Sequence, residues 1–316
     1  MYYIVLCNVK LVVVLFLINQ LRRNSIMRIR SLLMNLILIT CLSGCAVLPV
    51  TPKYQSAKSF DGVPISYAVY GDKPVTLVFV HGWSCDSRYW NNQVPYFETR
   101  YRVVTVDLAG HGHSGMERTD YTMEAFGQDV KAVVDQIGAR KVILIGHSMG
   151  GTVIAEAARL MPDRVIGIIG VDTIQNLERR FTPEEYTDFT APFESDFRGH
   201  TDSFVREMFV DSTDPKIVEW VAADMSSAPP HVGISALKSY AKKYLDGTAP
   251  DVFESLDIPV RAVNADLWPT DAEANRRHMK SFEVTIIKNA GHFIMLDRAR
   301  DCNSALDAAI AGLLEK

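Results

Sequence analysis

The stretch VILIGHSMGGTVIAEAARL, residues 142–160, decides the fold class of this 316-residue chain. Its first four residues form a continuous apolar run that is typical of a buried parallel strand, and residues 152–160 favour a helix. Between them, the pentapeptide GHSMG at residues 146–150 places a serine on a tight strand-to-helix turn. Small residues on either side prevent clashes and let the serine side chain project above the sheet. This context, more than the pentapeptide itself, predicts a nucleophile at Ser148.

Short apolar runs rich in β-branched residues recur along the chain, and they are too continuously apolar to be half-exposed strands. Helical patterns separate them. In the clearest one, apolar residues repeat at three and four positions from Met123 to Ile137, with Thr122 placed to cap its start and Gly138 to end it. We therefore expect an α/β fold, with a mostly parallel sheet covered by helices on both faces. The expected buried strands are residues 75–80, 103–106, 142–145, 165–171, 260–263 and 284–287.

The alternation of strands and helices is interrupted between residues 177 and 253, where aromatic residues are dense and no parallel-strand run occurs. We expect a helical cap there, inserted into a core formed by residues 60–176 and 254–316. A hairpin begins this core, with strands at residues 60–63 and 65–70 and an Asp-Gly turn. Residues 45–59 are expected to form a tether.

At residues 142–160 the chain resembles the α/β-hydrolase superfamily, and the resemblance extends over about residues 60–316. It implies a catalytic triad in the chain order serine, acid, histidine. His292, in a Gly-His-Phe sequence between the last strand and the last helix, matches the position of the family's histidine. An imidazole there can take the proton of Ser148 and return it to the leaving group. The other histidines precede or adjoin the serine, or lie in the cap or a helical pattern, so none has the right place.

The acid of the triad is the least determined member. The resemblance places it just past the strand at 260–263, which favours Asp266, although many relatives carry the acid two residues further on, where this chain has Trp268. Asp271 and then Asp172 stay open as alternatives. Asp271 could instead cap the helix that follows it, and Asp172 could be a structural turn residue at the end of its strand.

The negative oxygen that forms when Ser148 attacks a carbonyl needs two fixed N–H donors. The resemblance implies the backbone amides of Met149, the residue after the nucleophile, and of Trp83, in a His-Gly-x loop. The Trp83 ring could also form part of the pocket wall. The resemblance also implies that His81 braces this loop through hydrogen bonds, and we expect the glycine-rich residues 107–115 to be structural.

The sharp strand-to-helix turn that carries the nucleophile is called the elbow. A serine there excludes the dehalogenase and epoxide-hydrolase branches of the superfamily, whose nucleophile is an aspartate. The favoured function is hydrolysis of a carboxylic ester through an acyl-enzyme, without a metal or an organic cofactor. Carbon-carbon bond, lactone, thioester and peptide hydrolysis use the same site and stay open, as does a ligand-binding lipoprotein without turnover. The aromatic cap favours an apolar acyl or aromatic small-molecule ester. The excess of acids over bases in residues 176–256 disfavours a strongly anionic substrate.

The N-terminus indicates export and lipidation. A cationic start at Met27 precedes an apolar stretch at 31–42 that is short for a membrane span. It ends in Leu-Ser-Gly-Cys45, which resembles the bacterial lipobox, so we expect residues 1–44 to be a leader and Cys45 to carry palmitate-like acyl chains. Translation could begin at Met27, and an extra membrane anchor before it stays open. The expected location is the periplasmic side of the bacterial envelope, with lipid anchoring to a membrane. A resemblance to enterobacterial lipoproteins, with Ala46 rather than Asp after the cysteine, implies the outer membrane.

The balance of charge argues against a nucleic-acid partner. The net charge is −4, and it becomes about −9 when the five cations before Cys45 are removed, since no acid precedes Cys45. Duplex binding relies on Lys and Arg to neutralise phosphates. The expected partners are therefore a small-molecule ester and a membrane.

Overall fold

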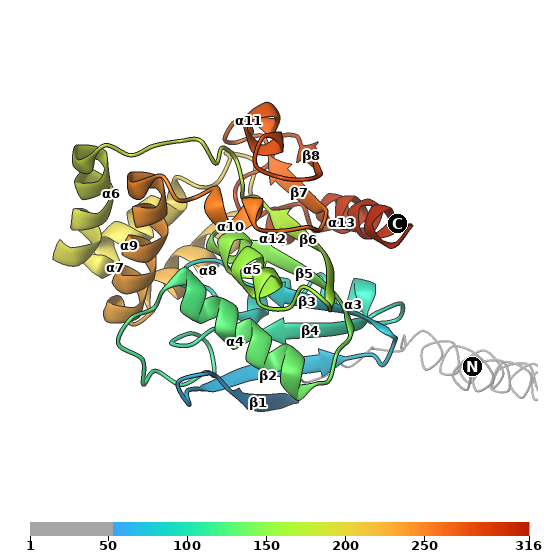
Figure 1. The fold of residues 1–316 in the computed structure, drawn as a ribbon. Coiled ribbons are helices and arrows are strands. Elements are labelled where there is room, and N and C mark those ends of the chain that lie inside the picture. The colour runs from blue at the N-terminus through green and yellow to red at the C-terminus, as the bar shows by residue number, and fades with distance from the viewer. Residues whose placement is uncertain (1–52, 316) are drawn as a thin grey trace, which may run out of the picture. The chain divides into compact units, whose positions relative to one another are not determined.

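A computed structural model describes residues 53–315 of the chain. Its centre is an eight-stranded sheet in the order β1-β2-β4-β3-β5-β6-β7-β8 (Figure 1). The pairs β1/β2 and β2/β4 are antiparallel, and all other neighbours are parallel. The predicted α/β class and mostly parallel sheet are thus confirmed. The strands are β1 (Tyr54–Lys58), β2 (Pro64–Tyr70), β3 (Val75–Val80), β4 (Arg102–Val106), β5 (Lys141–His147), β6 (Val165–Val171), β7 (Val260–Ala265) and β8 (Phe282–Ile287).

The strand β5 owes its central place to its continuous apolar sequence. Residues 142–145 have no exposed surface, because β3 and β6 flank the strand and helices cover it. Each such buried side chain contributes about 1.5–3 kcal/mol of hydrophobic stabilisation. Since β5, β6 and β7 run parallel, their carboxyl ends meet at one edge of the sheet.

Helices flank this sheet. α4 (Met123–Gln136) and α5 (Met149–Arg159) lie side by side across the strands (Figure 1). The predicted cap of α4 is present, because Thr122 Oγ accepts a hydrogen bond from the Ala125 amide at 3.1 Å, and Gly138 follows the helix with a φ of 64°. The other helices outside residues 177–250 are η1 (Ser87–Trp90), α3 (Val94–Phe97), α10 (Asp251–Glu254), α11 (Ala272–Arg276), α12 (Ile294–Asp297) and α13 (Ala299–Leu314).

The segment expected to be a helical cap, residues 177–253, contains four longer helices that group together beside the sheet (Figure 1). Thr182 and Glu185 form a reciprocal capping box at the start of the first of these helices. Phe193, Val205 and Ala236 are completely buried within the group. The four helices are α6 (Pro183–Ser195), α7 (Phe197–Arg206), α8 (Pro215–Ser226) and α9 (Pro230–Asp246).

The start of the core differs from the expectation. Residues 54–58, assigned to the tether, form β1, and the predicted strand at 60–63 is the turn that joins β1 to β2. Ser59 closes this turn by donating its amide to the Val63 carbonyl at 2.9 Å. The sequence YQSAK has one buried apolar residue, Ala57, so its pairing with β2 rather than its hydrophobicity makes it a strand.

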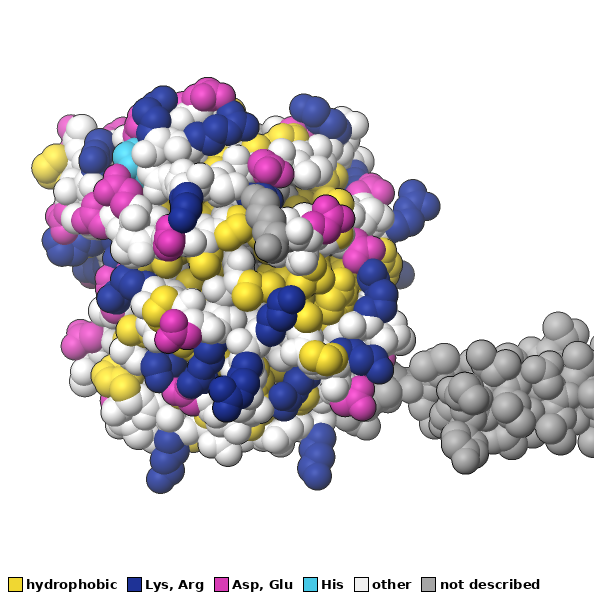
Figure 2. All heavy atoms as spheres, turned by 45° about the vertical axis from the view of Figure 1, so that its right-hand side comes forward, with side chains coloured by type: hydrophobic (Ala, Val, Ile, Leu, Met, Phe, Trp, Pro, Cys, Tyr) yellow, Lys and Arg dark blue, Asp and Glu magenta, His cyan; other side chains and the backbone are white. Residues whose placement is uncertain are grey.

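The predictions for the leader, residues 1–44, and for lipidation at Cys45 fall outside the described residues. Within residues 53–315, no helix is both long enough and apolar enough to cross a membrane. Basic and acidic side chains are interspersed on the face drawn in Figure 2, with apolar side chains between them.

Candidate active site

Ser148 occupies a strained position between β5 and α5. Its φ of 54° and ψ of −122° are unusual for a residue with a side chain, and such a backbone costs on the order of 1–3 kcal/mol. Two hydrogen bonds hold it in place. The Ser148 amide donates to the Val171 carbonyl at 3.1 Å, and the Gly151 amide donates to the Ser148 carbonyl at 2.9 Å. The sharp turn places the hydroxyl at the edge of the sheet, where it lines a pocket.

The two flanking glycines are required by this turn. A Cβ on Gly146 would lie 2.3 Å from the Gly150 carbonyl oxygen, and a Cβ on Gly150 would lie 2.7 Å from the His81 carbonyl oxygen. Both contacts are with backbone, which cannot move aside cheaply. The pattern Gly-x-Ser-x-Gly is therefore required because the turn around Ser148 packs closely against its own backbone and against the loop after β3.

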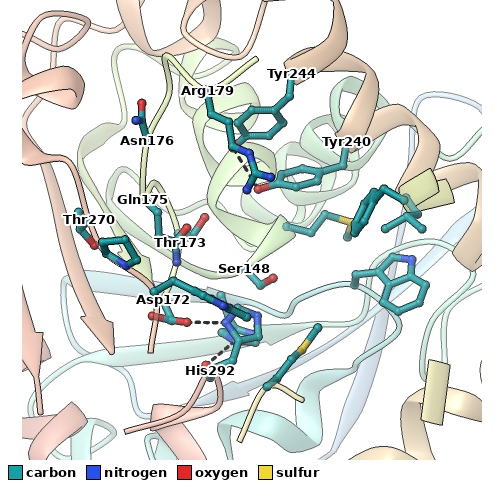
Figure 3. A pocket seen from close by; sticks show the side chains of 18 of the residues that line it. Ser148, Asp172, Thr173, Gln175, Asn176, Arg179, Tyr240, Tyr244, Thr270 and His292 are labelled. Atoms are coloured by element: carbon teal, nitrogen blue, oxygen red, sulfur yellow. Dashed lines mark hydrogen bonds and ion pairs between the residues drawn. The ribbon is translucent and has the colours of Figure 1, made fainter. Parts of the chain in front are cut away.

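His292 lies on the loop between β8 and α12, as the resemblance implied. It is 6% exposed, and its amide donates to the carbonyl of Met208 from the cap at 2.8 Å. The adjacent His147 ring donates from Nε2 to the His292 carbonyl at 3.1 Å. These contacts fix the loop, so the imidazole faces the same pocket as Ser148 (Figure 3). No hydrogen bond joins the two side chains within residues 53–315, a separation that is common before substrate binds.

Asp172 is the carboxylate that contacts this imidazole. Its Oδ2 lies 2.5 Å from His292 Nδ1, and its Oδ1 accepts the Ala265 amide at 2.7 Å (Figure 3). Asp172 is 2% exposed and has a φ of 44° at the end of β6. Asn264 secures the next residue, because its side chain accepts from the Thr173 amide at 3.1 Å and donates to the Thr173 carbonyl at 2.9 Å. The carboxylate is thus held rigidly against one nitrogen of the ring.

The expectation that Asp266 pairs with His292 is wrong. The Asp266 carboxylate accepts the Ala290 amide at 3.3 Å, which holds its pKa below the usual value, and lies 4.0 Å from Lys288 Nζ. The alternative Asp271 caps α11 by accepting the Ala274 amide at 2.9 Å. The last alternative, Asp172, is the carboxylate that contacts His292, reaching it from the carboxyl end of β6.

The loop after β3 packs against the serine elbow. A Cβ on Gly82 would lie 2.7 Å from His147 Nδ1 and 3.2 Å from Ser148 Cβ. In the described part of the chain, the amides of Trp83 and Met149 have no protein acceptor. Both N–H groups are therefore free to bind a negative oxygen next to Ser148, as the resemblance implied.

His81 braces this loop in the expected manner. It is completely buried, donates from Nδ1 to the Gly82 carbonyl at 2.8 Å and accepts from the Leu108 amide at Nε2 at 3.0 Å. Burial lowers the pKa of His81, so the neutral ring that this pattern requires is favoured. The glycine-rich loop is also structural, because buried Asp107 accepts hydrogen bonds from the Ser87 and His113 amides.

The pocket above Ser148 has a volume of about 1290 Å³. The Trp83 ring forms part of its wall, with its centroid 5.2 Å from that of Phe193, and its Nε1 donates to the Gly233 carbonyl of the cap at 2.7 Å. Cys85 also lines the pocket, but burial raises the pKa of its thiol well above the usual value and makes it a poor nucleophile. Apolar cap and core side chains in the lining are Phe181, Phe189, Phe204, Met208, Met225, Leu237 and Phe293.

Sequence reasoning missed three contributors to the site. Asn264, at the carboxyl end of β7, secures the backbone of Thr173 next to Asp172. The Trp268 ring centroid lies 5.1 Å from that of His292. Arg179 lines the pocket from the segment between β6 and α6. These residues lie at or after the carboxyl ends of β6 and β7. Because ligands in α/β sheets bind beyond those ends, this position could have predicted that they line the site.

Known proteins resemble this chain to different extents. A model of the alpha/beta hydrolase family matches residues 77–305. A non-heme chloroperoxidase from Streptomyces lividans is 35% identical over 117 residues, or 36% of this chain and 42% of that protein. A bifunctional esterase/perhydrolase from Acinetobacter calcoaceticus is 36% identical over 97 residues, or 30% and 35%. The chain thus spans less than half the length of these relatives. A thermophilic esterase from Thermogutta terrifontis shares the fold, with a TM-score of 0.71 and 22% identity over 83% of this chain and 99% of that one.

Proposed function

The chain belongs to the alpha/beta hydrolase family, and from this premise we propose that it is a serine esterase with Ser148 as nucleophile, His292 as base and Asp172 as acid. The observation that carries the proposal is the 2.5 Å contact between Asp172 and His292, on the pocket that also contains the Ser148 hydroxyl. Structural histidines are commonly buried, but this one is joined to a buried carboxylate and open to a pocket on its other side. That arrangement is what proton transfer to and from a serine requires.

The proposed reaction begins when Ser148 Oγ attacks the ester carbonyl and His292 Nε2 takes the serine proton. The carbonyl oxygen becomes negative and accepts hydrogen bonds from the Trp83 and Met149 amides. Asp172 stabilises the positive imidazolium through Nδ1. The carbonyl re-forms as the alcohol leaves with the proton from His292. Water, deprotonated by His292, then attacks the acyl-enzyme, and Ser148 recovers its proton as the carboxylic acid departs.

The pocket favours an ester with an apolar acyl or aromatic part. Apolar side chains from the cap and the core face Ser148 across a volume that exceeds that of a small acetyl group. One curated relative carries esterase in its name, although the matched segment is short. Lactones and thioesters would use the same atoms, so chain length and leaving group decide the preferred substrate.

Hydrolysis of p-nitrophenyl esters from acetate to decanoate tests this proposal. We expect measurable turnover by the wild type, with the highest kcat/KM at medium chain length, and loss of turnover in Ser148→Ala. Ser84→Ala is a matched control, because Ser84 is a buried serine in the neighbouring loop, also at positive φ, with no assigned chemical role. A folded wild-type protein that hydrolyses no ester, lactone or thioester would refute the enzyme proposal and favour a ligand-binding lipoprotein.

We also propose that the mature protein is a lipoprotein of the bacterial envelope, anchored through Cys45. The support is the cationic start, the apolar stretch of residues 31–42 and the lipobox-like ending at Cys45. Metabolic labelling with an alkyne-modified palmitate should mark the wild type and not Cys45→Ala, which should leave the membrane fraction. Membrane retention of the unlabelled variant would instead implicate the apolar run before Met27.

A further inference from the structure

One wall of the pocket carries three polar side chains that the proposed reaction does not use. Tyr240 and Tyr244 lie one turn apart on α9, and their hydroxyls are 3.2 Å from each other. The Arg179 guanidinium lies 4.9 Å from the Phe181 ring centroid. Figure 3 shows this group on the opposite side of Ser148 from Asp172 and His292. We call Arg179, Tyr240 and Tyr244 the polar wall.

Arg179 is not neutralised by the protein. Among the described residues it forms no ion pair with Asp or Glu, whereas Arg88, Arg118 and Arg206 each bind two carboxylates. Five acids also line the pocket: Asp172, Glu185, Asp188, Asp271 and Glu273. Among the described residues none of them pairs with Arg179, and Asp172 contacts His292, Glu185 accepts the Thr182 amide at 2.7 Å in the capping box, and Asp271 caps α11. The guanidinium therefore keeps its donors available on the pocket side.

The two tyrosines complement this charge. Burial raises the pKa of both phenols, so they are neutral and each carries a proton near pH 7. Their mutual hydrogen bond uses one of the two protons and leaves the other to donate to a ligand. Within residues 53–315 neither hydroxyl has another protein partner. The Arg179 guanidinium, which pairs with no acid among the described residues, and the remaining phenol proton both line the pocket and together constitute a site for an anionic oxygen group.

We propose that the polar wall binds a single carboxylate at the end of the substrate remote from the ester, so that half-esters of dicarboxylic acids are preferred over neutral esters of equal length. This inference rests on the proposed esterase function, because Ser148 supplies the other end of the site. A monoanion suits the wall better than a phosphate, since one arginine faces the pocket and Asp188, Asp271 and Glu273 also line it. The apolar side chains between the wall and Ser148 would contact the methylene chain.

The test compares substrates that differ only in the terminal group: mono-p-nitrophenyl suberate with p-nitrophenyl octanoate, and mono-p-nitrophenyl adipate with p-nitrophenyl hexanoate. In the wild type, kcat/KM should be higher for the acidic member of at least one pair. Arg179→Gln should lower the acidic-to-neutral ratio by about 10- to 100-fold, mostly through KM. Arg198→Gln is the control, because Arg198 is exposed on α7 outside the pocket and should leave the ratio unchanged. A wild-type ratio below one for both pairs, or a ratio unaltered in Arg179→Gln, would overturn the inference while leaving an active esterase intact.

A binding measurement tests this inference independently of the proposed esterase function. Calorimetric titration of the full-length protein with suberamic acid, the monoamide of suberic acid, and with octanamide requires no turnover, and these two ligands differ only in the terminal group remote from the amide. Tighter binding of suberamic acid, with the difference removed in Arg179→Gln and reduced in Tyr240→Phe, would support the polar wall even if no ester were hydrolysed. Equal binding of the two ligands by the wild type would refute it.

Discussion

Asp172→Asn distinguishes most sharply between the two candidate acids: Asp172, which contacts His292 in the structure, and Asp266, which the sequence favoured. The asparagine can keep the hydrogen bond from the Ala265 amide through its oxygen, so the fold around β6 and β7 should survive. Its NH₂ group would then face His292 Nδ1 in place of a carboxylate oxygen. The ring must adopt the other tautomer to accept this hydrogen bond, and it loses the negative charge that stabilises its protonated form.

The magnitude follows from the geometry. The carboxylate and imidazolium charges would be centred about 4 Å apart, and at an effective dielectric constant of about 20 their attraction is about 4 kcal/mol. Since each 1.4 kcal/mol is about a factor of ten in rate, the loss is about a thousandfold. The wrong tautomer adds to this effect, so we expect kcat for a p-nitrophenyl ester to fall by about 10³- to 10⁴-fold.

The assay compares Asp172→Asn with Asp266→Asn under saturating substrate, with unfolding in urea measured for both. Asp266 is a matched control, because it follows the neighbouring strand but contacts Ala290 rather than His292. Its variant should retain activity within about threefold, as a surface substitution outside the site. Near-normal turnover in folded Asp172→Asn, together with a large loss in Asp266→Asn, would refute the assignment of Asp172 as the acid of the triad.

Three further predictions concern the elbow, the histidine and pH. Gly150→Ala should destabilise the protein and abolish turnover, because the new Cβ would lie 2.7 Å from the His81 carbonyl oxygen; urea unfolding and ester assays measure both effects. Trp268→Ala should reduce kcat about 2- to 10-fold, by removing a ring that can stabilise protonated His292, and Trp268→Phe should recover part of it. Burial lowers the pKa of His81 in the folded protein, and it lowers the pKa of His111 to about 3. As pH falls, these two histidines are therefore protonated at a higher pH in the unfolded chain than in the folded protein. The free energy of unfolding should therefore decrease from pH 7 to pH 5, by up to about 1.4 kcal/mol per pH unit for each histidine, and a flat urea midpoint would contradict this.

The sequence was sufficient for the parts of the fold that depend on local pattern. Residues 142–160 combine an unbroken apolar run with a turn that tolerates only glycine on either side, and both features are steric requirements of the structure. The resemblance to the α/β-hydrolase superfamily implied the position of His292 between the last strand and the last helix, where the structure places it. The strand and the turn depend on neighbours in sequence, which is why local pattern could predict them.

The acid could not be predicted because its choice depends on neighbours in space. Asp172 and Asp266 each follow a strand, and the two strands are adjacent and parallel. Asp172 contacts His292 and has a positive φ at the end of β6, whereas the Asp266 carboxylate accepts the Ala290 amide. The polar strand β1 was missed for a similar reason, since its pairing with β2 is not visible in its own residues.

Covalent trapping of the nucleophile is the direct test of Ser148 as the reactive residue. The full-length protein would be treated with a fluorophosphonate, digested and analysed by mass spectrometry. We predict one covalent adduct, on the peptide that contains Ser148, formed rapidly in the wild type, at least a hundredfold more slowly in His292→Ala and not at all in Ser148→Ala. An adduct on another residue, or equal labelling of the wild type and His292→Ala, would contradict the assignment of Ser148 as nucleophile and His292 as its base.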